Sequence, residues 1–91
     1  YGTPAIRARG KFFLRMHDNG EDLVLKVGEV EQGFLIDAEP EIFYITDHYR
    51  GSSLVLVRLA NISPVMLRDV LEQAWRQLAS KRDIVAYDKR N

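Results

Sequence analysis

The chain has 91 residues, of which 46% are hydrophobic, and this size and composition predict one globular domain with a modest core. Thirteen basic and thirteen acidic side chains give a formal net charge of zero, so overall charge indicates no class of partner. The absence of cysteine excludes disulfides and thiolate chemistry and fits a cytoplasmic protein. No stretch approaches the roughly 20 apolar residues of a membrane helix.

The charges are distributed unevenly along the sequence. Residues 1–17 contain Arg7, Arg9, Lys11 and Arg15 and no acid, whereas residues 18–41 are rich in Asp and Glu and contain a single Lys. Such an asymmetry can give a neutral protein one basic face.

Residues 4–9 and 11–17 are predicted to form two strands, because side chains alternate in character along both. One face is expected to hold the apolar side chains, which are Ile6, Ala8, Phe12, Leu14 and Met16. The outward face is expected to hold Arg7, Arg9, Lys11, Phe13, Arg15 and His17.

A third strand is predicted over residues 22–27, where Leu23, Leu25 and Val27 alternate with polar or smaller residues. Asn19-Gly20 precedes it, and both residues tolerate the positive φ angles of a type I′ hairpin turn. The first three strands are therefore expected to form a meander.

Residues 29–38 predict a helix, with acidic residues in its first turn, where the helix dipole favours them. Val30, Phe34 and Ala38 recur at a spacing of four, with Leu35 beside them, and mark the expected apolar face. Pro40 ends the helix, because the residue before a proline disfavours the α conformation.

Residues 43–46 and 54–59 predict a hairpin of two antiparallel strands around the polar turn at 47–53. The turn contains Asp47, His48, Ser52 and Ser53, which are residue types of a catalytic triad. Neighbours in sequence do not converge around an oxyanion hole, so we expect no enzyme here. Asp47 is expected to cap backbone N–H groups and Tyr49 to pack.

Ser63-Pro64 is typical of a helix start, and a helix is predicted over residues 64–79. Its apolar side chains fall on one face and are expected to form core: Leu67, Val70, Leu71, Ala74, Trp75 and Leu78. A short final helix is expected after Ser80.

A metal site is suggested only weakly by His17, Asp18, Glu21, Asp22 and His48. A strand occupies the rest of any calcium loop, so no metal or cofactor is expected.

Together these elements predict an α+β fold for residues 1–91 as a single domain. We expect a five-stranded antiparallel sheet, built from a three-stranded meander, a helix and a hairpin. The helices should pack on one face of this sheet, giving two layers.

Several segments together resemble the YjbR family, also called MmcQ/YjbR-like proteins. They are TPAIRARGKFF at 3–13, EDLVLKV at 21–27, AEPEIFYITDHYRG at 38–51, LVLVRL at 54–59, and the Trp75 helix followed by SKR at 80–82. The resemblance implies a fold similar to CyaY and to secretion chaperones, a DNA-binding role, and no active site. Ser52-Ser53 departs from the aromatic residue and proline that the family commonly shows there.

Family members begin with a helix before the Tyr-Gly-Thr-Pro stretch, and by resemblance we expect about one helix to be missing before Tyr1. The resemblance therefore implies an uncovered apolar patch near Ile6, Phe12 and Leu14. A second copy could fill that patch, which would make the protein a homodimer.

Basic side chains interleaved with an exposed aromatic residue suit phosphate contact and base stacking. The candidate nucleic-acid-binding residues are Arg7, Arg9, Lys11, Phe13, Arg15, Arg50 and Arg58. A solvated sheet face would have the same composition. We expect a non-enzymatic DNA-binding module that contacts phosphates weakly, with little sequence preference. The alternative is a protein-interaction module, like the secretion chaperones, acting through an apolar surface.

Overall fold

The computed structural model describes residues 5–90, and it confirms the predicted α+β class. The strands are β1 (Ala5–Ala8), β2 (Lys11–Met16), β3 (Asp22–Lys26), β4 (Phe43–Tyr44) and β5 (Leu54–Arg58). The helices are α1 (Glu29–Ala38), the 3-10 helix η1 (Asp47–Tyr49), α2 (Pro64–Leu78) and α3 (Lys81–Arg90). None of the helices in this described range is long and apolar enough to cross a membrane.

The five strands form one antiparallel sheet in the order β1-β2-β3-β5-β4. The meander and the hairpin are thus both present, and β5 joins them by pairing with β3 along its whole length. Leu14 lies opposite Leu25, and Leu25 lies opposite Val55. Leu25 and Val55 are completely buried, so the core is centred on the middle strands.

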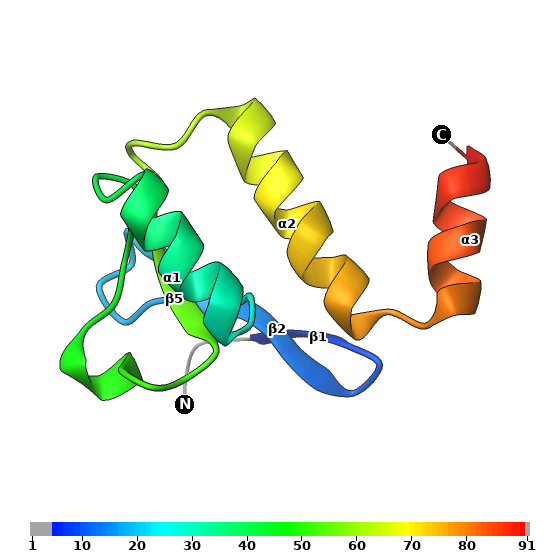
Figure 1. Ribbon diagram of the computed structural model, residues 1–91, viewed down its shortest axis with the longest axis horizontal. Coiled ribbons are helices and arrows are strands. Elements are labelled where there is room, and N and C mark those ends of the chain that lie inside the picture. The colour runs from blue at the N-terminus through cyan, green and yellow to red at the C-terminus, as the bar shows by residue number, and fades with distance from the viewer. Residues whose placement is uncertain (1–4, 91) are drawn as a thin grey trace.

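Helices α1 and α2 lie side by side over the same face of the sheet, and α3 stands apart beyond the end of α2 (Figure 1). Leu35 of α1 and Ala74 of α2 are buried in one cluster with Leu25 and Val57 of the sheet. The predicted start of α2 is confirmed, because the Ser63 hydroxyl accepts the Met66 N–H at 3.1 Å.

The opposite face of the sheet is covered over its centre by the segment that contains η1. Tyr49 is buried there against Val24 and Leu56. The packing expected of Tyr49 is therefore confirmed. This face is consequently not an open surface across the middle strands.

A β-bulge between β1 and β2 changes which residues share a face. Ile6 pairs with Leu14 and Arg7 pairs with Phe12, so Phe13 is an extra residue on β2. Phe13 and Leu14 both pack on the side of α1 and α2, and Phe12 packs on the other side. The predicted placement of Phe12 inward and Phe13 outward was wrong, because strict alternation assumes no inserted residue.

The type I′ turn lies at Arg9-Gly10, where φ is 55° and 77°, and not at Asn19-Gly20. At the second turn Gly20 has a positive φ of 71°, and no such φ occurs at Asn19. The loop there is longer: the His17 N–H donates to the Asp22 carbonyl at 2.8 Å.

The expected apolar face of α1 is also corrected. Leu35 is the buried residue of this helix, and Ile36 is half-buried. Val30 and Phe34, which have the spacing of four, are 88% and 64% exposed. The pattern identified the helix correctly and assigned its apolar stripe to the wrong side.

Candidate functional site

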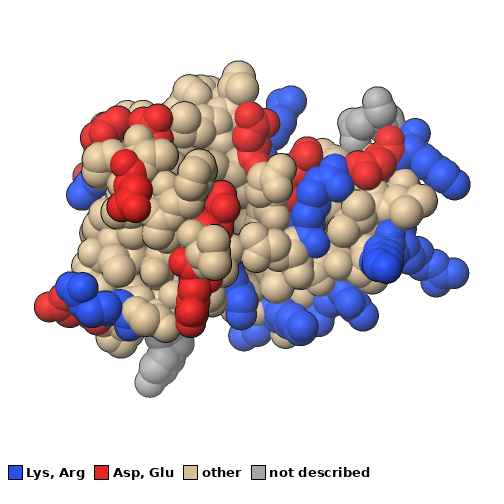
Figure 2. Space-filling view, in the orientation of Figure 1, with Lys and Arg blue, Asp and Glu red and all other residues tan. Residues whose placement is uncertain are grey.

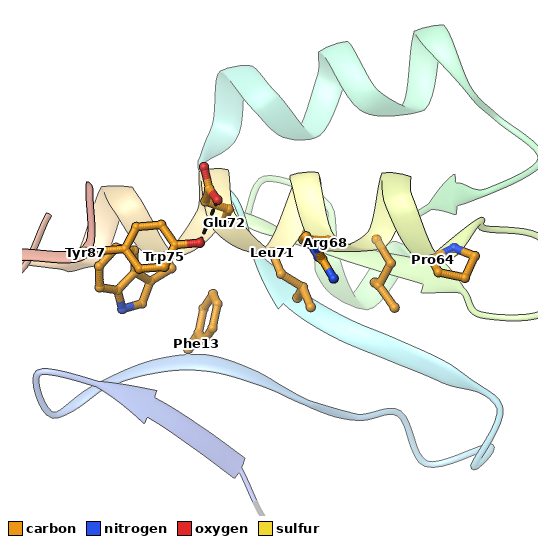
Figure 3. A pocket seen from close by; sticks show the side chains of 8 residues that line it. Phe13, Pro64, Arg68, Leu71, Glu72, Trp75 and Tyr87 are labelled. Carbon is orange, nitrogen blue, oxygen red and sulfur yellow. Dashed lines mark hydrogen bonds between the residues drawn. The ribbon is translucent and has the colours of Figure 1, made fainter. Parts of the chain in front are cut away.

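An apolar groove with a volume of ≈ 510 Å³ lies along one flank of α2. Phe13 of β2, Leu67, Leu71 and Trp75 of α2, and Tyr87 of α3 line it (Figure 3). In this close view the Phe13 ring projects from the strand toward α2, and Trp75 lies next to Tyr87. The groove therefore joins β2 to α2 and α3, which are distant from β2 in the sequence.

The groove exists because the sheet covers only part of the apolar stripe of α2. Ala74 and Leu78 are buried toward the core, whereas Leu67, Leu71 and Trp75 are only half-buried. A core-facing helix normally carries an apolar stripe at least 100° wide, and here one edge of that stripe stays uncovered. Trp75, predicted to be a core residue, lies instead in this groove.

The bulge in β2 supplies the opposite wall. Because Phe13 is the inserted residue, its ring lies on the α2 side together with Leu14. Ile6, which pairs with Leu14, lies on the same side and is 56% exposed on the edge strand. An uncovered apolar patch near Ile6 was predicted, and Phe13 continues it in place of Phe12.

Helix α3 closes one end of the groove through a small set of contacts. The ring centroids of Trp75 and Tyr87 are 5.3 Å apart, and the Tyr87 hydroxyl donates to Glu72 Oε1 at 2.9 Å. This hydrogen bond to Glu72 raises the pKa of Tyr87. Arg76 Nη2 lies 2.6 Å from Asp88 Oδ1, and its hydrogen bond lowers the pKa of the Asp88 carboxyl.

The groove lining contains one basic side chain, Arg68, and one acidic side chain, Glu72, whose carboxylate is bound to Arg76 and to the Tyr87 hydroxyl. Lys11 pairs with Ala8 on the α2 side of the sheet, two residues before Phe13, and it is exposed. Arg68 lines the groove and is also exposed. Figure 2 shows Lys and Arg gathered over the β1–β2 hairpin and around α3, while Asp and Glu gather over the opposite end of the molecule. An apolar floor with a basic rim suits a partner that is apolar and acidic.

The residues predicted to bind nucleic acid do not share one face. Arg7 and Arg15 pair with Phe12 and Ala5 on the side away from α2, whereas Lys11 and Phe13 lie on the α2 side. The expectation of a single basic sheet face was therefore wrong, and the reason is the bulge at Phe13.

Three of the predicted arginines are engaged within the chain. Arg15 donates to the Tyr49 hydroxyl and to the Met16 carbonyl, both at 2.9 Å. The guanidinium of Arg58 lies 4.0 Å from the Tyr44 ring centroid and donates to the Pro40 carbonyl. Arg50 pairs with Asp47 at 2.7 Å, so the predicted capping role of Asp47 is replaced by an ion pair. These arginines have structural partners.

The hairpin retains three cations that are exposed. Arg7, Arg9 and Lys11 form no ion pair within residues 5–90. Arg7 donates only a long hydrogen bond of 3.5 Å to the Gly10 carbonyl. This smaller set is what remains of the predicted phosphate-binding surface.

The polar turn at residues 47–53 is held by its own backbone. The Ser52 hydroxyl donates to the Tyr49 carbonyl at 2.7 Å and accepts the Leu54 N–H at 3.1 Å. The His48 ring packs edge-on against Tyr49, with centroids 5.0 Å apart. Among the residues that the structure describes, no three His, Asp or Glu side chains gather as metal ligands.

A second polar cluster lies on the face away from the groove. The Tyr44 hydroxyl donates to the buried Asp22 carboxylate, which also accepts from Asn19 Nδ2 at 3.1 Å. Burial and the bond to Asp22 raise the pKa of Tyr44 to about 12. Since Asn19 also accepts the N–H groups of Glu21 and Asp22, this cluster fastens the β2–β3 turn.

Sequence reasoning missed the groove and the part that Tyr87 plays in it. The available signal was the stripe of six apolar positions on α2, which is more than one flank of a small sheet can cover. Leu67 and Leu71 do pack against the core, as predicted, but both also line the groove together with Trp75.

Comparison with known proteins places the chain among uncharacterized relatives. A model of the YjbR family matches residues 1–77. Uncharacterized proteins of Mycobacterium bovis and Mycobacterium tuberculosis are 38% identical over 53 residues, which is 58% of this chain and 41% of each relative. The chain thus matches less than half the length of these relatives. No solved structure matches, so the likeness to CyaY and to secretion chaperones stays a prediction.

Proposed function

The chain belongs to the YjbR family, and from that premise we propose that it is a non-enzymatic interaction module. Its groove binds an amphipathic helix whose polar flanks are acidic. The observation that carries this proposal is the half-buried apolar floor of Phe13, Leu71 and Trp75, beside which Arg68 is exposed.

The apolar side chains of the groove indicate that its partner is a helix. Leu67, Leu71 and Trp75 follow one another at spacing four along α2, and the Phe13 ring projects toward α2 across the groove (Figure 3). Two walls of this kind accept the ridge of a third helix, which is the helix-in-groove mode of recognition. Helices in contact lie 8–10 Å apart, so the partner would run beside α2 over the edge of the sheet.

The rim charges support the acidic flanks. Arg68 lines the groove and Lys11 lies two residues before Phe13 on β2. Both are exposed, and neither forms an ion pair within the described residues. Exposed ion pairs add only about 0.2–1 kcal/mol each, so burial of the apolar ridge would supply most of the affinity. The charges would select among partners and speed their association.

The proposal is tested with two synthetic peptides that share one apolar face and carry either Glu or Lys on the other. Trp75 is the single Trp of the chain, so its fluorescence reports occupancy of the groove. We expect the Glu peptide to shift the emission of Trp75 and to bind roughly threefold to tenfold more tightly than the Lys peptide. Arg68→Glu should remove that preference.

A groove variant and a matched control locate the binding. Leu71→Glu places a charge in the apolar floor and should abolish binding of the Glu peptide. Val65→Glu changes an exposed side chain of the same helix outside the groove lining and should leave binding unchanged. Equal binding of both peptides, or binding that survives Leu71→Glu, would refute the proposed function.

A second candidate function is weak contact with DNA phosphates through the β1–β2 hairpin. The exposed cations Arg7, Arg9 and Lys11 favour it, since they have no acidic partner in the described part of the chain. Three neutralised phosphates would make the logarithm of the binding constant fall with log salt at a slope of roughly −2.7. Arg9→Glu should reduce both the affinity and that slope, and duplex binding without salt dependence would exclude this candidate.

The cytoplasmic location stays a prediction from composition.

A further inference from the structure

We propose that the groove receives helix α1 of a second copy of this chain, so that copies associate head to tail. This inference rests on the proposed function, because it names the partner of the same groove. Two surfaces carry it: the groove itself and an exposed apolar ridge on α1.

The ridge consists of Val30 and Phe34. These residues are 88% and 64% exposed, and they lie one helical turn apart on the side of α1 away from buried Leu35. A large aromatic ring and a β-branched side chain at this spacing present a continuous apolar strip about one turn long. Strips of this kind are what helix-in-groove recognition inserts.

The charge on α1 matches the rim of the groove. Residues 29–38 contain Glu29, Glu31 and Asp37 and no Lys or Arg, so α1 is an acidic amphipathic helix. Arg68 lines the groove, and Lys11 lies two residues before Phe13 on β2. Glu72 also lines the groove, but its carboxylate is bound to Arg76 and to the Tyr87 hydroxyl. The chain thus carries both the partner that the groove suits and the groove itself.

Helix α3 is a poorer occupant, although Val85 on it is also exposed. Its basic residues include Lys81, Arg82 and Lys89, and in a contact between copies these would lie near Lys11 and Arg68. Repulsion between these like charges would oppose docking of α3. The acidic ridge of α1 is therefore favoured.

The contact has to be made between copies. Helix α2 stands between α1 and α3 (Figure 1), and the groove opens on the α3 flank of α2. Within one chain α2 separates α1 from the groove, so α1 can enter only the groove of another copy. Because ridge and groove are different surfaces, the contact is heterologous and produces a ring or an open chain of copies.

The test measures the mass of the protein in solution by light scattering as its concentration rises. The parent should form assemblies larger than a monomer, and Phe34→Glu and Leu71→Glu should each be monomeric. Val30→Glu should weaken association at least tenfold, whereas Val65→Glu, which changes an exposed valine at the same second position of α2, should leave it unchanged. Circular dichroism confirms that each variant is folded, and Arg68→Glu provides an exposed groove variant should Leu71→Glu unfold.

Mixing the two defective variants is the decisive step. The Leu71→Glu variant keeps an intact ridge, and the Phe34→Glu variant keeps an intact groove. An equimolar mixture should therefore form a one-to-one dimer and nothing larger. A symmetric contact of groove with groove would give no such dimer, and that result would overturn the inference. A monomeric parent that still binds the Glu peptide would overturn self-association and leave the proposed function standing. A parent that associates but does not bind the peptide, with association insensitive to Leu71→Glu, would contradict both.

Discussion

The ring of Tyr87 lies 5.3 Å from the indole of Trp75, and the two ring planes are inclined by 58°. This contact joins α3 to α2 at the end of the apolar groove. The Tyr87 hydroxyl also bonds to Glu72, and Arg76 bonds to Asp88. A few contacts along one stretch of α2 thus hold the helix that closes the groove.

Replacing Tyr87 by Ala should release α3 while the rest of the domain stays folded. An aromatic pair contributes about 0.5–1.5 kcal/mol beyond its buried area, and its loss removes the apolar anchor of α3. We expect faster amide hydrogen exchange at residues 81–90 and a red shift of Trp75 emission. Tyr87→Phe keeps the ring and loses the bond to Glu72, so it should show a smaller change in exchange. Unchanged exchange in Tyr87→Ala would mean that other contacts hold α3.

The core and the groove should respond differently to truncation. Leu25 is completely buried, so Leu25→Ala should lower the free energy of unfolding by about 2–5 kcal/mol in urea melts. Trp75 is half-buried, so Trp75→Ala should cost less than the roughly 3–5 kcal/mol of a fully buried Trp. A larger loss for Trp75→Ala than for Leu25→Ala would place Trp75 in the core, as the sequence pattern suggested.

Two glycines should respond in opposite directions to the same substitution. Gly10 has a φ of +77° in the type I′ turn, so Gly10→Ala should destabilise the protein by about 1 kcal/mol through backbone strain. Gly33 lies inside α1 with open space around it, and Gly33→Ala should stabilise by up to about 1 kcal/mol. Thermal melts of both variants check this pair, and a stabilising Gly10→Ala would contradict the turn assignment.

Alkaline pH should weaken the Tyr44–Asp22 contact. Tyr44 has a pKa of about 12 in the folded protein, against about 10 for an unfolded tyrosine. Its contribution to stability is therefore complete below about pH 10 and is lost as the pH rises toward 12, because the unfolded state releases the proton first. Absorbance titration of the phenolates should show a tyrosine that ionises toward pH 12 in the parent and not in Tyr44→Phe. A titration in which every tyrosine ionises near pH 10 would contradict this contact.

Most of the fold follows from local patterns in the sequence. Ser63 and Pro64 mark the start of α2, and Pro40 marks the end of α1, because caps and proline act within one turn of chain. Alternation identified the strands and the meander. These features depend on neighbours in sequence, so the sequence contains the information directly.

The predictions that were wrong concern how segments distant in the sequence pack together. Alternation cannot reveal the residue that a bulge inserts, so Phe12 and Phe13 were assigned to the wrong faces. Spacing of four on α1 cannot say which side meets the sheet, and Leu35 occupies that side instead of Phe34. The groove depends on both facts, since Phe13 forms one wall and the width of the sheet decides how much of α2 is covered.

The central claim, that the groove binds an acidic amphipathic helix, is tested most directly by nuclear magnetic resonance of the full chain during a titration with the Glu peptide. We predict that the indole N–H of Trp75 and the amides of residues 67–75 shift together and saturate, while the amides around Asp22 and Tyr44 on the opposite face stay unchanged. Shifts confined to the β1–β2 hairpin, or no shift of the Trp75 indole at saturation, would contradict the account.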